Sequence, residues 1–187
     1  PVAAYAATQK IDAVAVMPML SFGYAMAAYT AQNYGAQKYE RIRAGVRACL
    51  KMSMAFAVGI GILLIAFGTH VLALFVGADA AGAEEVIAYG RTYLIVTGST
   101  YTLLSLLLVY RNVLQGLGQS VIPTIAGVME LIMRAVAAIF LCSSFGFLGA
   151  CMAYPLAWIG AAVPVVLAYF WTCLLYTSPS PRDRQKS

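Results

Sequence analysis

Glu130 and Arg134 are the residues of this sequence whose types and spacing most directly suggest chemistry. They lie in the apolar segment 126–141, which carries no other charged residue. On a helix, side chains four residues apart share a face, so an acid and a base at this spacing can pair. Such a pair either fixes the register of packed helices or takes part in moving a proton or a cation. The spacing alone leaves both interpretations open.

The solvent around this pair is expected to be lipid. Hydrophobic residues make up 62% of the 187 residues and charged residues 10%, whereas about 25% of a typical soluble domain is charged. Long uncharged stretches run over 13–37, 92–110, 112–129 and 135–181. A membrane-spanning helix needs roughly 20 mostly apolar residues. The composition therefore predicts an all-α, polytopic membrane helix bundle.

The uncharged stretches predict about five spans, and the loops between them predict their direction. We expect helices near 12–33, 50–76, 89–113, 122–142 and 147–171, with residues 1–11 as the end of an earlier helix and its turn. The first loop, 35–51, is strongly basic, and the third loop carries Arg111. The second loop carries Asp79, Glu84 and Glu85. Basic residues concentrate in cytoplasmic loops, so the first and third loops are expected there. Topology thus explains the basic cluster better than nucleic-acid binding does.

Depth along the spans brings a second acid into question. At about 1.5 Å per residue, Glu130 lies roughly 12 Å and Arg134 roughly 18 Å into the fourth span. The same count places Asp12, in the first span, at a similar level to Arg134. Ionised groups at this depth normally face a bundle interior or a wet cavity. We expect a cluster of Asp12, Glu130 and Arg134, with Lys10 as a further candidate. Two acids against one arginine would leave a carboxylate for a proton or a cation.

The third span has a polar middle, and Tyr101 is the candidate there for a substrate or cation path. Hydrogen bonds between helices are the plainer explanation of the neighbouring polar side chains, which are Thr97, Ser99, Thr100 and Thr102. The sequence shows no Ser/His/Asp set, no metal-ligand spacing and no phosphate-binding glycine loop. We therefore expect neither an enzyme nor a metal site nor a cofactor.

The end of the sequence differs sharply from the rest. From Cys173 the chain reads CLLYTSPSPRDRQKS, in which apolar sequence gives way to Ser, Pro and Arg. This string resembles the in-frame translation of a sequencing adapter. We expect residues 1–172 to form the transmembrane lobe and residues 173–187 to be a non-native or disordered tail.

Three segments together resemble the multidrug and toxic compound extrusion (MATE) family of transporters. AQNYGAQKYER, residues 31–41, is similar to the family's Q-x-x-G-A-x-x-x-x-x-R junction. RNVLQGLGQS, residues 111–120, with Pro123, resembles its second cytoplasmic junction. Glu130 and Arg134 match the E-x-x-x-R of the helix that follows. The resemblance implies a bacterial inner-membrane protein with two six-helix lobes around a central cavity. This chain would be most of the second lobe, with its first helix mostly missing.

The resemblance also implies a function and partners. Such proteins expel small cationic organic compounds in exchange for protons or sodium ions, so membrane lipid, these substrates and the missing N-terminal lobe are the implied partners. One departure is that the third span, 92–110, has no acid, whereas some relatives carry a cation-binding acid there. Two alternatives remain: a lipid-linked saccharide flippase of the same superfamily, which requires a strongly cationic cavity, and a non-transporting assembly protein, which requires Glu130 and Arg134 to saturate each other.

Overall fold

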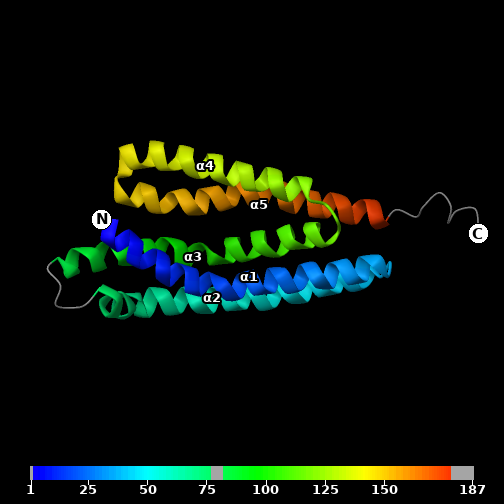
Figure 1. Cartoon of the computed structure of the whole chain (residues 1–187), viewed down its shortest axis with the longest axis horizontal. Helices are drawn as coiled ribbons and strands as arrows, with labels where there is room; N and C mark the ends of the chain where they lie inside the picture. Colours follow the sequence, from blue (N-terminus) through cyan, green and yellow to red (C-terminus); the bar gives the residue numbers. More distant parts are fainter. Residues whose placement is uncertain (1, 77–81, 178–187) are drawn as a thin grey trace, which may run out of the picture.

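The computed structural model describes residues 2–76 and 82–177, and over these residues the chain forms five helices (Figure 1). Each helix is long and apolar enough to cross a membrane, which confirms the all-α membrane bundle. Asp79 of the acidic second loop and residues 178–187 of the expected tail lie outside the described residues. The bounds of the helices are α1 Val2–Gly35, α2 Tyr39–Val76, α3 Ala83–Gly116, α4 Val121–Phe145 and α5 Phe147–Thr177.

The helices extend further than their apolar stretches, and this corrects two expectations. Helix α1 begins at Val2, so residues 2–11 continue the first span and do not end an earlier one. Their alanine-rich sequence favours helix and contains no breaker. Helix α2 begins at Tyr39, so most of the basic first loop is helical. At the other end of the chain, α5 continues to Thr177.

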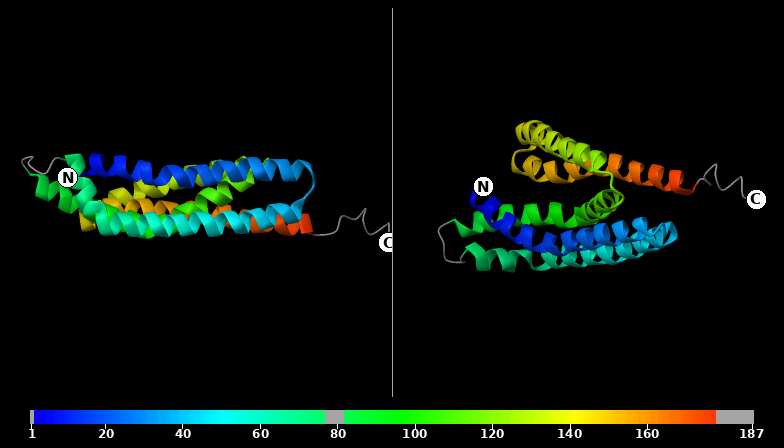
Figure 2. Two further views of the ribbon diagram at one scale, coloured as in Figure 1. Left: turned by 90° about the horizontal axis from the view of Figure 1, so that it is seen from below. Right: turned by 45° about the vertical axis from the view of Figure 1, so that its right-hand side comes forward.

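Helix α3 is the centre of the bundle. It packs against α1, α2 and α5, whereas α4 packs chiefly on α5 and touches α3 narrowly. Figures 1 and 2 show the result, in which α1, α2 and α3 pack together and α4 and α5 form a pair beside them. We call the group of α1, α2 and α3 the α1–α3 layer. In the most apolar stretch of α3 half of the residues are buried, whereas in the most apolar stretch of α4 only 6% are buried. Large apolar side chains therefore cover the outer face of α4, including Leu131, Ile139 and Phe140.

Small residues allow a close approach of helices α2 and α3. A Cβ atom added to Gly61 would lie 2.5 Å from the carbonyl oxygen of Gly98, which is closer than any real Cβ contact. Glycine at this position therefore sets the distance between the two backbones. Close approach through small residues is a common way to pack membrane helices, because lipid supplies no hydrophobic drive for their association.

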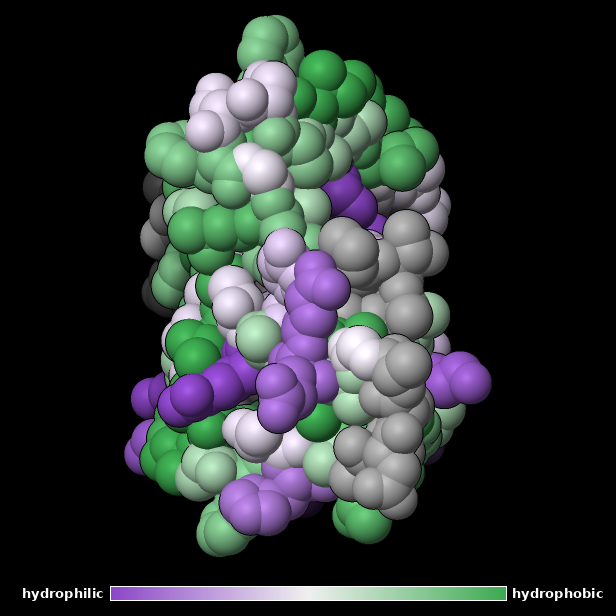
Figure 3. Space-filling model, turned by 90° about the vertical axis from the view of Figure 1, so that its left-hand side faces the viewer, coloured by the Kyte–Doolittle hydropathy of each residue, from purple (hydrophilic) through white to green (hydrophobic). Residues whose placement is uncertain are grey.

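The two ends of the bundle differ in charge. The α1–α2 and α3–α4 connections share one end of the bundle (Figure 1). Helix α2 starts there, and its first turns carry Arg41, Arg43 and Arg47. Glu84 and Glu85 begin α3 at the opposite end. Figure 3 views that opposite end and shows hydrophilic residues over the α1–α3 layer, with a mainly hydrophobic α4–α5 pair. The alternation of basic and acidic ends is the one expected from the loops.

Candidate functional site

Glu130 of α4 holds two arginines from different helices. Its Oε1 accepts a hydrogen bond of 2.5 Å from Nη2 of Arg134, one helical turn further along α4. Its Oε2 lies 3.6 Å from Nη1 of Arg111, which comes from α3. The Glu130 side chain is 17% exposed, and the side chains of Arg111 and Arg134 are 30% and 36% exposed, so the acid is the most buried of the three groups. The pairing of Glu130 with Arg134 agrees with the expectation from their spacing.

Arg111 is a member of the site that the sequence did not indicate. We interpreted it as a topology signal in the third cytoplasmic loop. In the structure, α3 continues to Gly116, so Arg111 projects from the helix toward α4. A basic residue just inside the end of a span gives the same sequence signal whether it points to water or to a buried acid. The packing of α3 against the α4–α5 pair decides between the two.

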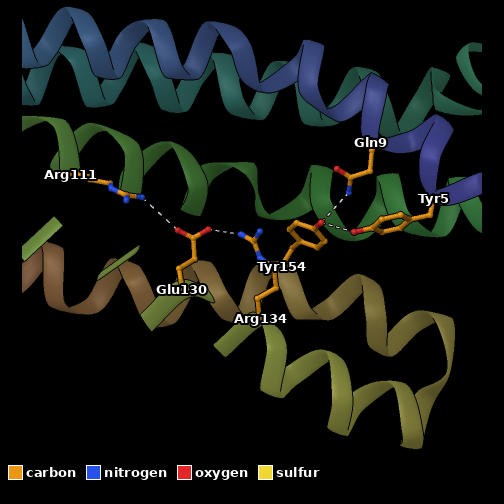
Figure 4. Close-up of polar contacts among 6 residues, drawn as sticks. All are labelled: Tyr5, Gln9, Arg111, Glu130, Arg134 and Tyr154. Carbon is orange, nitrogen blue, oxygen red and sulfur yellow. Dashed lines mark hydrogen bonds and ion pairs between the residues drawn. The ribbon is translucent and has the colours of Figure 1, made fainter. Parts of the chain in front are cut away.

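Arg134 reaches from α4 toward α3 (Figure 4), and its side chain is 36% exposed. Its guanidinium carbon lies 4.6 Å from the centroid of the Tyr154 ring on α5, a cation–π contact. Its Nε is buried and has no hydrogen-bond partner in the described part of the chain. A buried donor without a partner is costly, so Arg134 is not saturated by Glu130.

Tyr154 connects the ion pairs to α1. Its hydroxyl lies 2.5 Å from the hydroxyl of Tyr5 and accepts a hydrogen bond of 3.1 Å from Nε2 of Gln9. Nε2 of Gln9 also donates to the hydroxyl of Tyr93 on α3, at 2.9 Å. Figure 4 shows the bonds of Tyr154 to Tyr5 and Gln9 in line with the ion pairs of Glu130, in the space between the α1–α3 layer and the α4–α5 pair. We call this set the polar seam; its members are Tyr5, Gln9, Tyr93, Arg111, Glu130, Arg134 and Tyr154.

Asp12 lies apart from the ion pairs, which corrects the expected single cluster. Its Oδ1 accepts a hydrogen bond of 2.5 Å from the hydroxyl of Tyr101, a fully buried residue of α3. Helix α1 packs on α2 and α3, whereas α4 packs chiefly on α5, so Asp12 meets α3 before it can reach Arg134. Gln9, three residues earlier on α1, makes the connection to the seam instead.

Lys10 also lies outside the cluster. It is exposed, whereas Asp12 is half-buried. Two residues along a helix correspond to a rotation of about 200°, so a face that buries Asp12 turns Lys10 outward.

The charges of the site differ from the expected two acids and one base. Two arginines surround Glu130, and Asp12 has no basic partner within the described residues. The carboxylate left without a cation is therefore Asp12. Tyr101, which the sequence singled out, is the residue that positions it. A carboxylate held by a phenol inside a membrane span can take up a proton or a small cation without first breaking an ion pair.

This fold and this site define the chain as a multi-pass helical membrane protein with an ionised interior, an arrangement typical of membrane transporters. A family model described as MatE matches residues 1–140, which include Asp12, Tyr101, Glu130 and Arg134. Because the match covers most of the sequence, the chain belongs to the MATE family of transporters.

Relatives of known name or structure agree with this assignment. The probable multidrug resistance protein YoeA of Bacillus subtilis (strain 168) is 24% identical over 170 residues, which are 89% of this chain and 35% of that protein. An inward-facing multidrug resistance MATE family transporter of the MOP superfamily superposes with a TM-score of 0.80 at 18% identity, over 96% of this chain and 41% of that one. A MOP superfamily transporter from Pyrococcus furiosus superposes with a TM-score of 0.78 at 17% identity, over 95% of this chain and 39% of that one.

The structural likeness shows a shared fold. At these identities it does not extend to substrates or to the roles of individual residues. The chain spans between 35% and 41% of the length of these three relatives. What a whole transporter does with this lobe is therefore a matter for proposal.

Proposed function

We propose that this chain is most of the second lobe of a cation-coupled efflux antiporter in the bacterial inner membrane. The complete transporter would expel small cationic organic compounds in exchange for protons or sodium ions. Membership of the MATE family supports the transporter class. The observation that carries the coupling proposal is Asp12, a half-buried carboxylate in a membrane span whose partner is the hydroxyl of Tyr101.

Glu130 would respond differently from Asp12. It forms ion pairs with two arginines, whereas Asp12 accepts a hydrogen bond from a neutral phenol. A proton or cation that reached Glu130 would weaken its hold on Arg111 and Arg134 together. Since Arg111 belongs to α3 and Glu130 to α4, loss of their ion pair would loosen the α3–α4 contact, which is narrow. Asp12 is thus the proposed coupling site, and Glu130 the proposed link between helices.

The charge balance of the seam disfavours the two alternatives. A flippase for an anionic lipid-linked saccharide needs excess positive charge, but Arg111 and Arg134 face Glu130, and Asp12 adds a further acid. An assembly protein needs Glu130 and Arg134 to saturate each other. Glu130 has a second partner in Arg111, and Nε of Arg134 has none among the described residues.

Dye efflux by a full-length transporter that carries this sequence as its second lobe tests the proposal. We expect Asp12→Asn and Glu130→Gln each to abolish proton- or sodium-driven efflux at normal expression, because each removes an ionisable group from the membrane interior. Glu84→Gln is the matched control, since Glu84 is exposed at the start of α3. This chain alone should not transport, because a cavity between two lobes needs both. Unchanged efflux in both variants would exclude Asp12 and Glu130 from the mechanism.

A further inference from the structure

A groove of about 410 Å³ lies at the basic end of the bundle, between α2 and α5, with Tyr110 of α3 in its lining. It is separate from the polar seam, and the proposed transport function does not use it. Arg43 and Arg47 of α2 line one side, and Tyr169 and Phe170 of α5 line the other. Val46 and Tyr110 are buried within it. The groove therefore combines two guanidinium groups with an apolar and aromatic wall.

Hydrogen bonds fix both arginines. Nη1 of Arg43 contacts Oε1 of Glu40 at 3.0 Å, and Nη2 donates to the backbone carbonyl of Cys173 at 3.3 Å. Nε of Arg47 donates to the backbone carbonyl of Arg43 at 3.4 Å. The two amino groups of Arg47 have no carboxylate partner in the part of the chain that the structure describes. Glu40 offsets Arg43, and Arg47 supplies the remaining positive charge of the groove.

The lining residues of α2 form one stripe. Arg43, Val46, Arg47 and Leu50 have the spacing i, i+3, i+4 and i+7, which places them on one face of a helix. From the helix start toward the membrane interior, this face changes from charged to apolar. Phe170, at 54% exposure, offers an apolar edge on the opposite wall. A ligand that follows the groove must carry negative charge at one end and hydrocarbon at the other.

We propose that this groove binds an anionic phospholipid from the leaflet at the basic end of the bundle. The phosphate of the headgroup contacts the free amino groups of Arg47, because a guanidinium matches the geometry of a phosphate. An acyl chain lies along Leu50 and Phe170. Basic pockets between membrane helices on the cytoplasmic side suit such headgroups. Free inorganic phosphate would leave the apolar wall unused.

The orientation of the helices in the membrane does not by itself require Arg43 and Arg47 to line the same groove. The positive-inside rule needs basic residues near the loop, in any direction around the helix. Arg41 meets that need and is exposed, yet it does not line the groove, because it lies two residues from Arg43 and so faces away. Arg41 is therefore the matched control for a specific site, with the same charge at the same end of α2.

Native mass spectrometry of the purified chain in detergent tests the proposal, with phosphatidylglycerol and phosphatidylcholine as the two probes. We expect preferential binding of phosphatidylglycerol, which Arg47→Gln weakens about fivefold and Arg41→Gln leaves unchanged. Glu40→Gln should tighten binding, because it removes the carboxylate of the groove. Circular dichroism would confirm that each variant is folded.

Three results would overturn the proposal. Equal losses in Arg41→Gln and Arg47→Gln would show non-specific attraction to a basic surface. Equal binding of the two lipids would show an apolar site. Displacement of phosphatidylglycerol by millimolar inorganic phosphate would show a phosphate site without a lipid component. None of these outcomes bears on efflux, so the proposed transport function is tested separately.

Discussion

At the scale of single residues, Tyr154 holds the polar seam together. One face of its ring lies against Arg134, and its hydroxyl is bound by Tyr5 and Gln9. The position of Arg134 relative to Glu130 therefore depends on a side chain of α5, although both charged residues belong to α4. This arrangement couples the ion pair to the packing of three helices.

Two substitutions of Tyr154 separate its ring from its hydroxyl. Tyr154→Phe keeps the ring under Arg134 and loses the bonds to Tyr5 and Gln9, at a cost of about 0.5–1.5 kcal/mol. Tyr154→Leu also loses the cation–π contact, worth about 0.5–2 kcal/mol. We expect the apparent Tm of the purified chain in detergent to be lower for Tyr154→Phe than for the unchanged chain, and lower still for Tyr154→Leu.

Tyr24 provides the control for these substitutions. It is 66% exposed, so Tyr24→Phe and Tyr24→Leu should leave the apparent Tm nearly unchanged. If the phenylalanine and leucine variants of Tyr154 were equally stable, the ring would contribute nothing to the position of Arg134.

The sequence could predict the part of the site that depends on local geometry. Glu130 and Arg134 are four residues apart on one helix, and their spacing alone places them in contact. Arg111 and Tyr154 depend on how α3 and α5 pack beside α4, which no spacing reports. The expected cluster grouped Asp12 with Glu130 and Arg134, whereas the hydrogen-bond partner of Asp12 is Tyr101 of α3, because equal depth in a membrane does not specify which helices are neighbours.

At the scale of helices, the apolar stretches predicted the number and order of the spans and missed their ends. Hydropathy detects the part of a helix inside lipid. The first turns of α1 and α2 are helical beyond that part, because alanine, arginine and lysine have high helix propensity whether or not lipid surrounds them. The basic residues expected in a loop therefore occupy α2, where Arg43 and Arg47 share a face.

Glycine at position 61 should matter more than glycine at position 59 of the same helix. An added Cβ at Gly61 would clash with the Gly98 carbonyl, whereas one at Gly59 meets nothing within 4 Å. We expect Gly61→Ala to destabilise the chain by about 1–3 kcal/mol through overpacking. Gly59→Ala should be neutral or slightly stabilising, because alanine has the higher helix propensity. Unfolding of the two variants in a denaturing detergent titration measures the difference, and equal midpoints would contradict a close α2–α3 contact.

At the scale of the whole molecule, the α4–α5 pair stands beside a layer of three helices, and the ionised groups lie between the two (Figures 1 and 4). Charges inside a membrane protein normally face its interior or a water-filled cavity. In a transporter with two lobes, the space beside α4 would be where this interior opens to water. The proposed coupling depends on that opening, because a polar seam closed to water could neither receive a proton nor respond to a substrate.

Water accessibility of α4 tests this most directly. In a full-length transporter that carries this lobe, with Cys49, Cys142, Cys151 and Cys173 replaced, single cysteines would be exposed to a membrane-impermeant cationic thiol reagent. We predict labelling of Arg134→Cys and of Ala138→Cys, which lies one turn further on the same face and leaves the ion pair intact. Ile132→Cys, on the opposite and apolar face, should not react. Labelling at position 132 with none at 134 and 138 would show that the charged face of α4 is closed to water, and would contradict the account.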